Sequence, residues 1–311
     1  QLTQRRVNTL ERKAWSTVWT NAATLFRLDS AYSFRKQEGA ARKVIIPDYL
    51  NMTMLPNRGQ TDREVAGEEK IRAGGFTLKK RIKKEPNGDV YLTDVPMVDQ
   101  GQKGYCAVAS VERVMRYYGV DIDQYQLAQM SETDAWAGGT NPDLLLKALR
   151  TMANYMNARV EVIEKMDKDW FRVMIEDYNR TARKMRRREI VLPTHGEITL
   201  ASNVFPQMEN DVYIQANSRS PVEVQLFAKN IKNKIDQGYP VLWSLWCGFV
   251  TEEKVIEYDD RAGHMRVIIG YNMPSNYVIY TDSWGPGHEF KRMNFRDARA
   301  VTTGLFTIEP R

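Results

Sequence analysis

The residue with the clearest chemical potential is Cys106, which follows a loop containing Gly101 and Gly104. After Cys106, apolar residues recur every three or four positions, without Gly or Pro until Gly119. This pattern predicts a half-buried helix that begins at the cysteine and ends at the glycine. In a first helical turn, unpaired N–H groups and the positive end of the helix dipole favour the thiolate, the nucleophilic form of cysteine. Cys106 is therefore a candidate nucleophile.

The sequence around this cysteine carries a wider resemblance. Gln100-Gly101-x-x-Gly104-x-Cys106-x-x-x-Ser110 resembles the active-site segment of papain-like cysteine peptidases. The resemblance implies that the side-chain amide of Gln100 and the backbone N–H of Cys106 form an oxyanion hole. The chain departs from the family's pattern at Lys103, where a second cysteine is common, and at Ala107, where a tryptophan is common. Both differences point to a distant branch.

The branch is indicated by the segments that follow. Residues 114–119 and 139–145 look like the corresponding parts of the bacterial double-glycine, or bacteriocin-processing, peptidases and their stand-alone relatives. The chain is accordingly identified as resembling one of those stand-alone relatives. It has neither an obvious membrane segment nor the Gly-x-x-x-x-Gly-Lys nucleotide-binding motif, so transport-linked processing of leader peptides is not expected.

A cysteine nucleophile needs an imidazole within hydrogen-bonding reach and a third group that orients the imidazole. Among three histidines, His264 begins a stretch that resembles the family's His-x-x-x-x-x-Gly-Tyr, and the sequence Asp282-Ser283-Trp284-Gly285 resembles the family's Asn-Ser-Trp-Gly. The resemblance implies that His264 is the base and that Asp282 orients it. Trp284 would shield their contact from water and lie at the substrate-binding groove.

Taken singly, each of these residues has an ordinary structural explanation. A buried cysteine is usually a small apolar side chain, a histidine at a strand start is usually structural, and Asp-Ser is a common turn. The order Gln, Cys, His, Asp, with matching local sequence, favours the catalytic interpretation. The family resemblance also suggests that Gly138 and Gly139 line the groove, although a tight turn explains two glycines equally well. Cys247, in an apolar run, is expected to pack in the core.

The remaining pattern predicts an α+β protein of papain-like type. Helical spacing is found around 122–128, 142–152, 168–188 and 223–237. Strand patterns rich in β-branched and aromatic residues follow at 241–246, 254–258, 265–271, 277–281 and 304–308. We therefore expect a helical half that carries the cysteine, packed on an antiparallel β-rich half that carries the histidine and aspartate, with the cleft between them.

Residues 1–90 are predicted to form a basic N-terminal extension ahead of a peptidase domain of residues 91–311. The extension carries 18 Lys and Arg against 10 Asp and Glu. Apolar steps of three and four residues predict an amphipathic helix over 4–37. Asn87-Gly88 predicts the turn of a hairpin whose strands are 76–82 and 90–92. The extension would be an inhibitory propeptide or a permanent layer on the peptidase domain, and its apolar helix face favours the permanent layer.

Composition argues against several other classes. The longest apolar run is far shorter than the roughly 18 residues of a membrane span. Two cysteines 141 residues apart and isolated histidines offer no close ligand pairs, so neither a metal nor a cofactor is expected. The basic run 79–84 lacks interleaved aromatics, and no nucleic acid is expected as a partner. The start at Gln1 fits either a removed signal peptide or a trimmed chain, so the location stays open. An extracytoplasmic or secreted location is slightly favoured, and a cytoplasmic one is equally compatible with the sequence.

The sequence thus predicts a cysteine peptidase that hydrolyses peptide bonds through Cys106, His264 and Asp282, with Gln100 in the oxyanion hole. Its partner would be a peptide or protein substrate. Two alternatives stay open. An acyltransferase of transglutaminase type uses the same Cys-His-Asp set, and an inactive peptide-binding module would keep the groove without the chemistry. No pattern in the chain specifies the substrate sequence or the oligomeric state.

Overall fold

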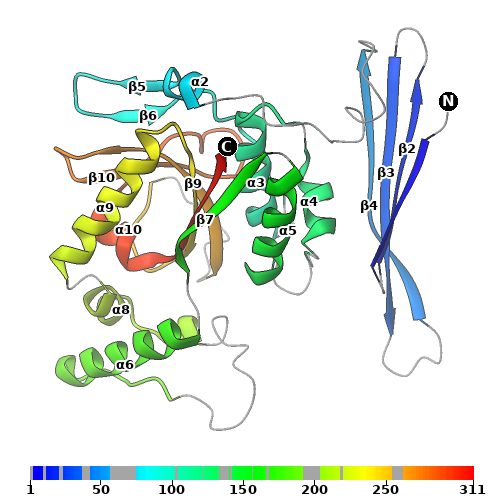
Figure 1. The fold of residues 1–311 in the computed structure, drawn as a ribbon. Helices are drawn as coiled ribbons and strands as arrows, with labels where there is room; N and C mark the ends of the chain where they lie inside the picture. The colour runs from blue at the N-terminus through cyan, green and yellow to red at the C-terminus, as the bar shows by residue number, and fades with distance from the viewer. Residues whose placement is uncertain are drawn as a thin grey trace.

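The structure is a computed structural model of the 311-residue chain. It describes residues 3–9, 12–20, 24–36, 43–56, 75–101, 104–120, 122–131, 133, 140, 142–155, 157–165, 168–191, 204–217, 220–253 and 262–311. Within these ranges the strands form two separate sheets (Figure 1), one of four strands near the N-terminus and one of eight strands in the rest of the chain.

The larger sheet is antiparallel throughout and is the framework of the molecule. Its main path runs β11-β10-β9-β8-β12-β7, and β6 joins β9 while pairing with β5. The strands are β5 (Ile82–Lys84), β6 (Val90–Leu92), β7 (Ala158–Lys165), β8 (Val241–Trp246), β9 (Gly263–Asn272), β10 (Tyr277–Thr281), β11 (Lys291–Asn294) and β12 (Thr302–Pro310). Strands β8, β9 and β10 are almost entirely buried, which explains their near-continuous apolar sequences.

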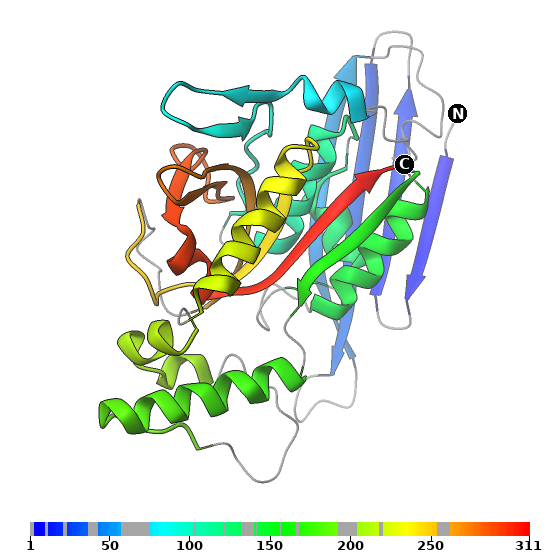
Figure 2. The same cartoon turned by 60° about the vertical axis from the view of Figure 1, so that its left-hand side comes forward.

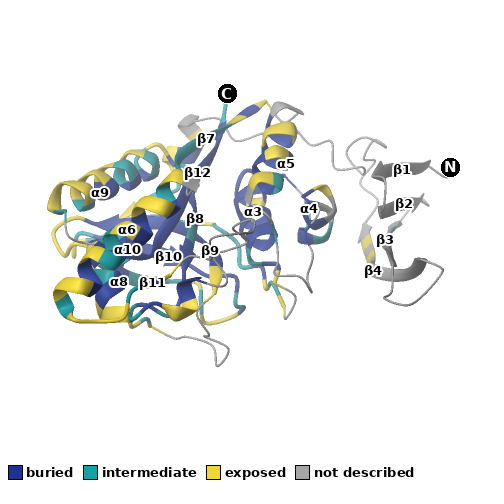
Figure 3. Cartoon of the chain, turned by 90° about the horizontal axis from the view of Figure 1, so that it is seen from below, coloured by how far each residue is buried: buried dark blue, intermediate teal, exposed yellow. Residues whose placement is uncertain are grey.

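Helices cover this sheet. They are α2 (Gly75–Lys79), α3 (Cys106–Tyr117), α4 (Gln124–Met130), α5 (Pro142–Tyr155), α6 (Lys168–Met185), the 3-10 turn η1 (Phe205–Gln207), α8 (Asn210–Asn217), α9 (Pro221–Ile235) and α10 (Phe295–Val301). Helix α3 packs against β9 and α4, α5 packs against β7, and α9 crosses the sheet over β8 and β9 (Figure 2). Figure 3 shows that the strands and the inward helix faces are buried, whereas the exposed residues lie on the outer helices and loops.

These observations confirm the α+β prediction. The helical half begins with Cys106, and the antiparallel half contains His264 and Asp282. The predicted strand 241–246 and the predicted strand 277–281 match β8 and β10, and the other predicted helices and strands of this part agree to within a few residues at their ends. The predicted strand 254–258 lies outside the described residues.

The hairpin β5–β6 is built as an extension of the main sheet. Gly88 has a φ of 92° in its turn, as the Asn-Gly pair predicts. Strand β6 then pairs with β9 at Gly270, where an added Cβ would lie 2.5 Å from the carbonyl oxygen of Val90. Only glycine allows this close approach of the two backbones. The segment 76–82, expected to be the first strand, instead contains α2, and the strand starts only at Ile82.

The helix predicted over 4–37 is wrong. This segment contributes β1 (Thr3–Thr9), β2 (Arg12–Thr20) and β3 (Thr24–Lys36), and with β4 (Lys43–Pro56) they form an antiparallel sheet in the order β1-β2-β3-β4. The apolar residues also alternate in stretches such as 26–34, and Trp, Thr, Val, Phe and Tyr are abundant. These residue types favour strands, and long-range pairing with 43–56 outweighs the helical spacing.

In the described part of 1–56, the basic extension therefore has strands where a helix was expected. The division of the chain at residue 90 stays a prediction, but the pairing of β6 with β9 means that the hairpin shares hydrogen bonds with the sheet of the peptidase region. On β4, the alternating residues Leu50, Met52 and Met54 are exposed.

Candidate active site

Cys106 is the first residue of α3, and its side chain is half-buried. The helix is fixed against β9 one turn later, where the hydroxyl of Ser110 donates to the carbonyl oxygen of Met265 over 3.0 Å. The backbone N–H of Met265 also donates to the Cys106 thiol. The backbone of Met265, the residue after His264, thus contacts both ends of the first turn of α3, which sets the position of the sulfur relative to the histidine.

His264 lies at the start of β9, where it pairs across the sheet with Leu245 of β8. Its Nε2 lies 2.7 Å from Oδ1 of Asp282, and its ring also hydrogen-bonds with the Cys106 thiol. Because Nε2 is engaged with the carboxylate, Nδ1 is the nitrogen that remains for the thiol. The indole of Trp284 stacks on the imidazole with centroids 4.9 Å apart and planes at 26°, so it covers the histidine–aspartate contact.

The charges of these three side chains depend on one another. Burial raises the pKa of the Cys106 thiol, but the hydrogen bond and charge of His264 outweigh burial and lower it. Burial would lower the pKa of His264, yet the charge and hydrogen bond of Asp282 raise it to about 9. Burial would raise the pKa of Asp282, but His264 and Arg266 hold it well below its usual range. At neutral pH this set favours thiolate, imidazolium and carboxylate.

Gln100 is connected to the same site through the residue after Asp282. The backbone N–H of Gln100 donates to the carbonyl oxygen of Ser283 over 2.8 Å, and the hydroxyl of Ser283 donates to Oε1 of Gln100 over 2.7 Å. With its oxygen held in this way, the Gln100 amide has its NH₂ group left to donate elsewhere. The neighbouring Gly285 is required by close packing, since a Cβ there would lie 2.9 Å from Oδ2 of Asp99.

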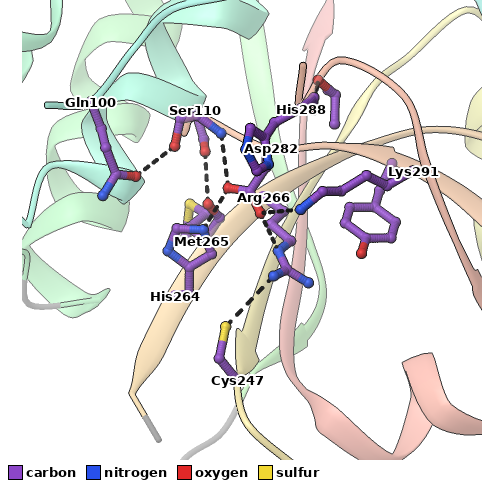
Figure 4. A network of polar contacts seen from close by, with 12 residues as sticks. Gln100, Ser110, Cys247, His264, Met265, Arg266, Asp282, His288 and Lys291 are labelled. Atoms are coloured by element: carbon purple, nitrogen blue, oxygen red, sulfur yellow. Dashed lines mark hydrogen bonds and ion pairs between the residues drawn. The ribbon is translucent and has the colours of Figure 1, made fainter. Parts of the chain in front are cut away.

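Asp282 is completely buried at the end of β10, and its two oxygens face different partners (Figure 4). Oδ1 accepts from His264 and from the N–H of Ser283, at 2.7 and 2.9 Å. Oδ2 lies 2.7 Å from Nε of Arg266 and 3.7 Å from Nζ of Lys291, and both cations are fully buried. A buried charge without partners is costly, so these two cations explain how a carboxylate is accommodated here.

Arg113 joins the segments that carry the candidate residues. It is a buried residue of α3, and it donates to the carbonyl oxygens of Pro96 and Asp282, each over 2.7 Å, and to the hydroxyl of Thr281. Pro96 precedes the Gln100 loop, α3 begins with Cys106, and Asp282 directly follows β10. One side chain therefore ties together the three backbone segments of the site.

Most of the chain matches a known protein family. The model of the Peptidase_C39 like family matches residues 92–185 and 196–302, which together make up well over half of the chain. The chain belongs to the Peptidase_C39 like family. This membership confirms the predicted relationship to the double-glycine peptidases and identifies the protein as a cysteine-type peptidase whose substrates are peptides.

A similar solved structure is xylellain, a cysteine protease from Xylella fastidiosa. It has a TM-score of 0.38 and 10% sequence identity, and the match covers 78% of this chain and 92% of that chain. No curated protein sequence matches this chain.

Within this member of the Peptidase_C39 like family, the structure brings Cys106, His264 and Asp282 together and ties Gln100 to their neighbour Ser283. Their catalytic roles stay a prediction. Gly138 and Gly139 lie outside the described residues, as does His195. His288 lies edge-on to Trp284, with ring centroids 5.6 Å apart. Neither cysteine is in a disulfide, and Cys247 is buried in the core as expected.

Sequence reasoning did not find three buried charged residues behind the site, namely Arg113, Arg266 and Lys291. Arg266 had a signal, because it is a charged residue within the otherwise apolar run 265–271. Such a residue in a buried strand requires a partner. Lys291 had none, since its burial depends on the placement of β11 beside β10.

Among the described residues, no three His, Cys, Asp or Glu side chains lie together as metal ligands would. In the same part of the chain, no helix is both long and apolar enough to cross a bilayer.

Proposed function

We propose that this peptidase cleaves peptide bonds through a Cys106-His264-Asp282 triad, with Gln100 and the backbone N–H of Cys106 as the oxyanion hole. The observation that carries the proposal is the buried chain of hydrogen bonds from the Cys106 thiol through His264 to Asp282, with 2.7 Å between Nε2 and Oδ1. A reactive thiol next to an oriented imidazole is the arrangement that nucleophilic catalysis by cysteine requires.

The reaction begins from the ion pair. The Cys106 thiolate attacks the scissile carbonyl carbon, and the carbonyl oxygen becomes an oxyanion that accepts from the Cys106 N–H and the Gln100 amide. The imidazolium of His264 then gives its Nδ1 proton to the leaving amine, and a thioester to Cys106 forms. Water attacks this thioester and loses a proton to His264, the C–S bond breaks to release the Cys106 thiolate, and the carboxylic acid product leaves. The thiolate–imidazolium pair is thereby restored. Asp282 holds Nε2–H throughout, which keeps Nδ1 directed at the sulfur.

The two pKa shifts define the pH range of this mechanism. The thiolate needs a pH above the lowered pKa of Cys106, and the proton donor needs a pH below the His264 value of about 9. Activity as a function of pH should therefore be bell-shaped, with its falling basic limb near that value. We further assign Trp284, Gly138 and Gly139 to the substrate groove. Trp284 is half-buried against His264, and the two glycines carry the family's groove motif.

The test is a peptide-library digestion by the wild-type protein, Cys106→Ala and Cys247→Ala, with products identified by mass spectrometry. Cleavage by the wild type and by Cys247→Ala, but not by Cys106→Ala, is the expected result. Adding a primary amine separates the transferase alternative, which would give amide products in place of free carboxylates. A folded wild-type protein that binds peptides without cleaving any would contradict the proposal and support the binding-module alternative.

A further inference from the structure

Arg266 is a fully buried arginine whose three nitrogens each have a separate partner. Nε lies 2.7 Å from Oδ2 of Asp282, and one terminal nitrogen lies 3.7 Å from Sγ of Cys247 (Figure 4). The other terminal nitrogen lies 2.5 Å from Oε2 of Glu252. Because residues two apart in a strand share a face, Arg266 and His264 reach the same side of β9. The strand therefore places base and guanidinium on either side of one carboxylate.

Aromatic rings enclose the guanidinium on its remaining sides. Its central carbon lies 4.9 Å from the ring of Tyr280, 5.1 Å from that of Trp284 and 6.0 Å from that of Trp243. Tyr280 also donates to Glu252 over 3.0 Å, which fixes the second carboxylate. This planar guanidinium has a carboxylate at each of two edges and aromatic rings against its remaining sides, so it has little freedom to rotate.

We propose that Arg266 is a positioning residue of the triad: it fixes Oδ2 of Asp282, so that Oδ1 faces His264. Its positive charge also offsets the negative charge of the carboxylate, so that His264 can release its proton. This inference rests on the proposed function. It explains why the chain tolerates Asp282 where the papain-like pattern has an amide. An amide is neutral, whereas a buried carboxylate without a cation would hold the imidazolium proton more tightly.

Other charged and titratable groups also face this site. Asp282 is also approached by Lys291 at 3.7 Å, and Arg113 binds its backbone oxygen. Lys291 is the weaker counter-charge, because it is 1.0 Å farther from Oδ2 than Nε of Arg266 and burial lowers its pKa. Around the guanidinium itself lie Glu252, Cys247 and Tyr280, and Cys106 faces His264 from α3.

The experiment compares the pH dependence of kcat/KM for the wild type, Arg266→Gln, Arg266→Lys and Glu252→Gln on one peptide whose cleavage requires Cys106. Arg266→Gln removes a positive charge, so the imidazolium is retained and the thiolate disfavoured, and both limbs should move up by about 0.5–1 pH unit. Arg266→Lys keeps the charge but loses the fork, so kcat should fall on the order of 10-fold with the limbs unmoved. Glu252→Gln removes a negative charge, and its limbs should move down.

A folded Arg266→Gln protein whose limbs match those of the wild type would overturn the proposal, since a purely structural arginine would change the folded fraction and leave the pH profile unchanged. If circular dichroism shows that Arg266→Gln does not fold, Glu252→Gln decides, because it keeps the neighbouring hydrogen bonds. Limbs that stay or move up in that variant would equally overturn the proposal. Failure of the proposed function looks different, because then either the folded wild type cleaves no peptide or cleavage survives Cys106→Ala.

Discussion

Among the described residues, two buried aspartates have cationic partners, and the surroundings of the two differ. Asp282 contacts His264, Arg266 and Lys291 beside the Cys106 thiol. Asp89, in the β5–β6 hairpin, is 2% exposed and accepts from Asn272 over 2.8 Å, from Tyr277 over 2.5 Å and from Arg292 over 3.0 Å. Both carboxylates have lowered pKa values, that of Asp89 being about 2 through these hydrogen bonds in spite of burial.

The two carboxylates differ in the groups that their partners contact. Asp89 connects the hairpin to β9, β10 and β11 through groups that are not within reach of a nucleophile, so it stabilises the sheet. Asp282 instead contacts the imidazole of His264 through Oδ1, and that imidazole in turn contacts the Cys106 thiol. Burial, ion pairing and a shifted pKa are thus shared by a structural and a candidate catalytic carboxylate, and only the histidine–cysteine contact separates them.

The largest contrast is expected from removing each carboxylate. Asp282→Ala should lower kcat/KM on the order of 10³-fold because His264 is no longer oriented. Asp89→Ala should leave kcat/KM close to wild type but lower the free energy of unfolding by about 1–3 kcal/mol, since buried donors lose their acceptor. Kinetics and denaturant unfolding of the two variants check this prediction. If Asp89→Ala is as inactive as Asp282→Ala while folded, the two carboxylates are not distinct in role.

Gln100 should show the next largest effect. If its amide donates to the oxyanion, Gln100→Ala should lower kcat on the order of 10²-fold with little change in KM or stability. Ser283→Ala, which frees Oε1 of Gln100 without removing the amide, should have a smaller effect. Steady-state kinetics separate these parameters, and a loss confined to KM would show that Gln100 only binds substrate.

Replacing each aspartate by asparagine sharpens the comparison further. Asp282→Asn removes the negative charge that raises the pKa of His264, so the imidazolium is lost at lower pH and the basic limb of kcat/KM should move down from about 9. Substantial activity should remain, because an amide oxygen still accepts the ring N–H. Asp89→Asn should leave that limb in place. If Asp282→Asn and Asp282→Ala are equally damaging, the carboxylate is required for its charge.

The same substitution at Asp89 predicts an effect of pH on stability. The folded pKa of Asp89 is lowered to about 2 from the ordinary value of 3.8, so its contribution is present above the ordinary value and is lost as the pH falls toward 2. The difference in unfolding free energy between wild type and Asp89→Asn should therefore shrink over this range. Thermal unfolding from pH 5 to pH 2 measures it, and a constant difference would show that charge is not what Asp89 contributes.

The peptidase half of the fold could be predicted from sequence because its signals are local and agree with one another. The helix after Cys106, the strand 241–246 and the turn at Asn87-Gly88 each combine periodicity with suitable boundary residues. The N-terminal segment lacked such boundaries. Over 4–37 the sequence has both helical spacing and strand alternation. The pairing of this segment with 43–56 favours strands, and local periodicity gives no information about such a pairing.

The candidate site divides in the same way. Gln100, Cys106, His264 and Asp282 stand in short recognisable segments, so they could be named in advance. The roles of Arg113, Arg266 and Lys291 could not be predicted, because they come from three-dimensional contacts. For Arg266 the sequence indicates only that a charge in an apolar run needs a partner. Arg113 donates to the backbone oxygens of Pro96 and Asp282, which belong to other segments of the chain. Lys291 becomes a partner of Asp282 only because β11 pairs with β10.

The central claim, that Cys106 is held as a thiolate by His264, is tested most directly by the rates of alkylation of the two cysteines. Limiting iodoacetamide at about pH 6, followed by peptide mass spectrometry, should label Cys106 before the buried Cys247, because only the thiolate reacts. In His264→Ala the labelling of Cys106 at this pH should fall to the level of an ordinary thiol. Equal labelling of both cysteines, labelling of Cys247 first, or an unchanged rate at Cys106 in His264→Ala would contradict the account.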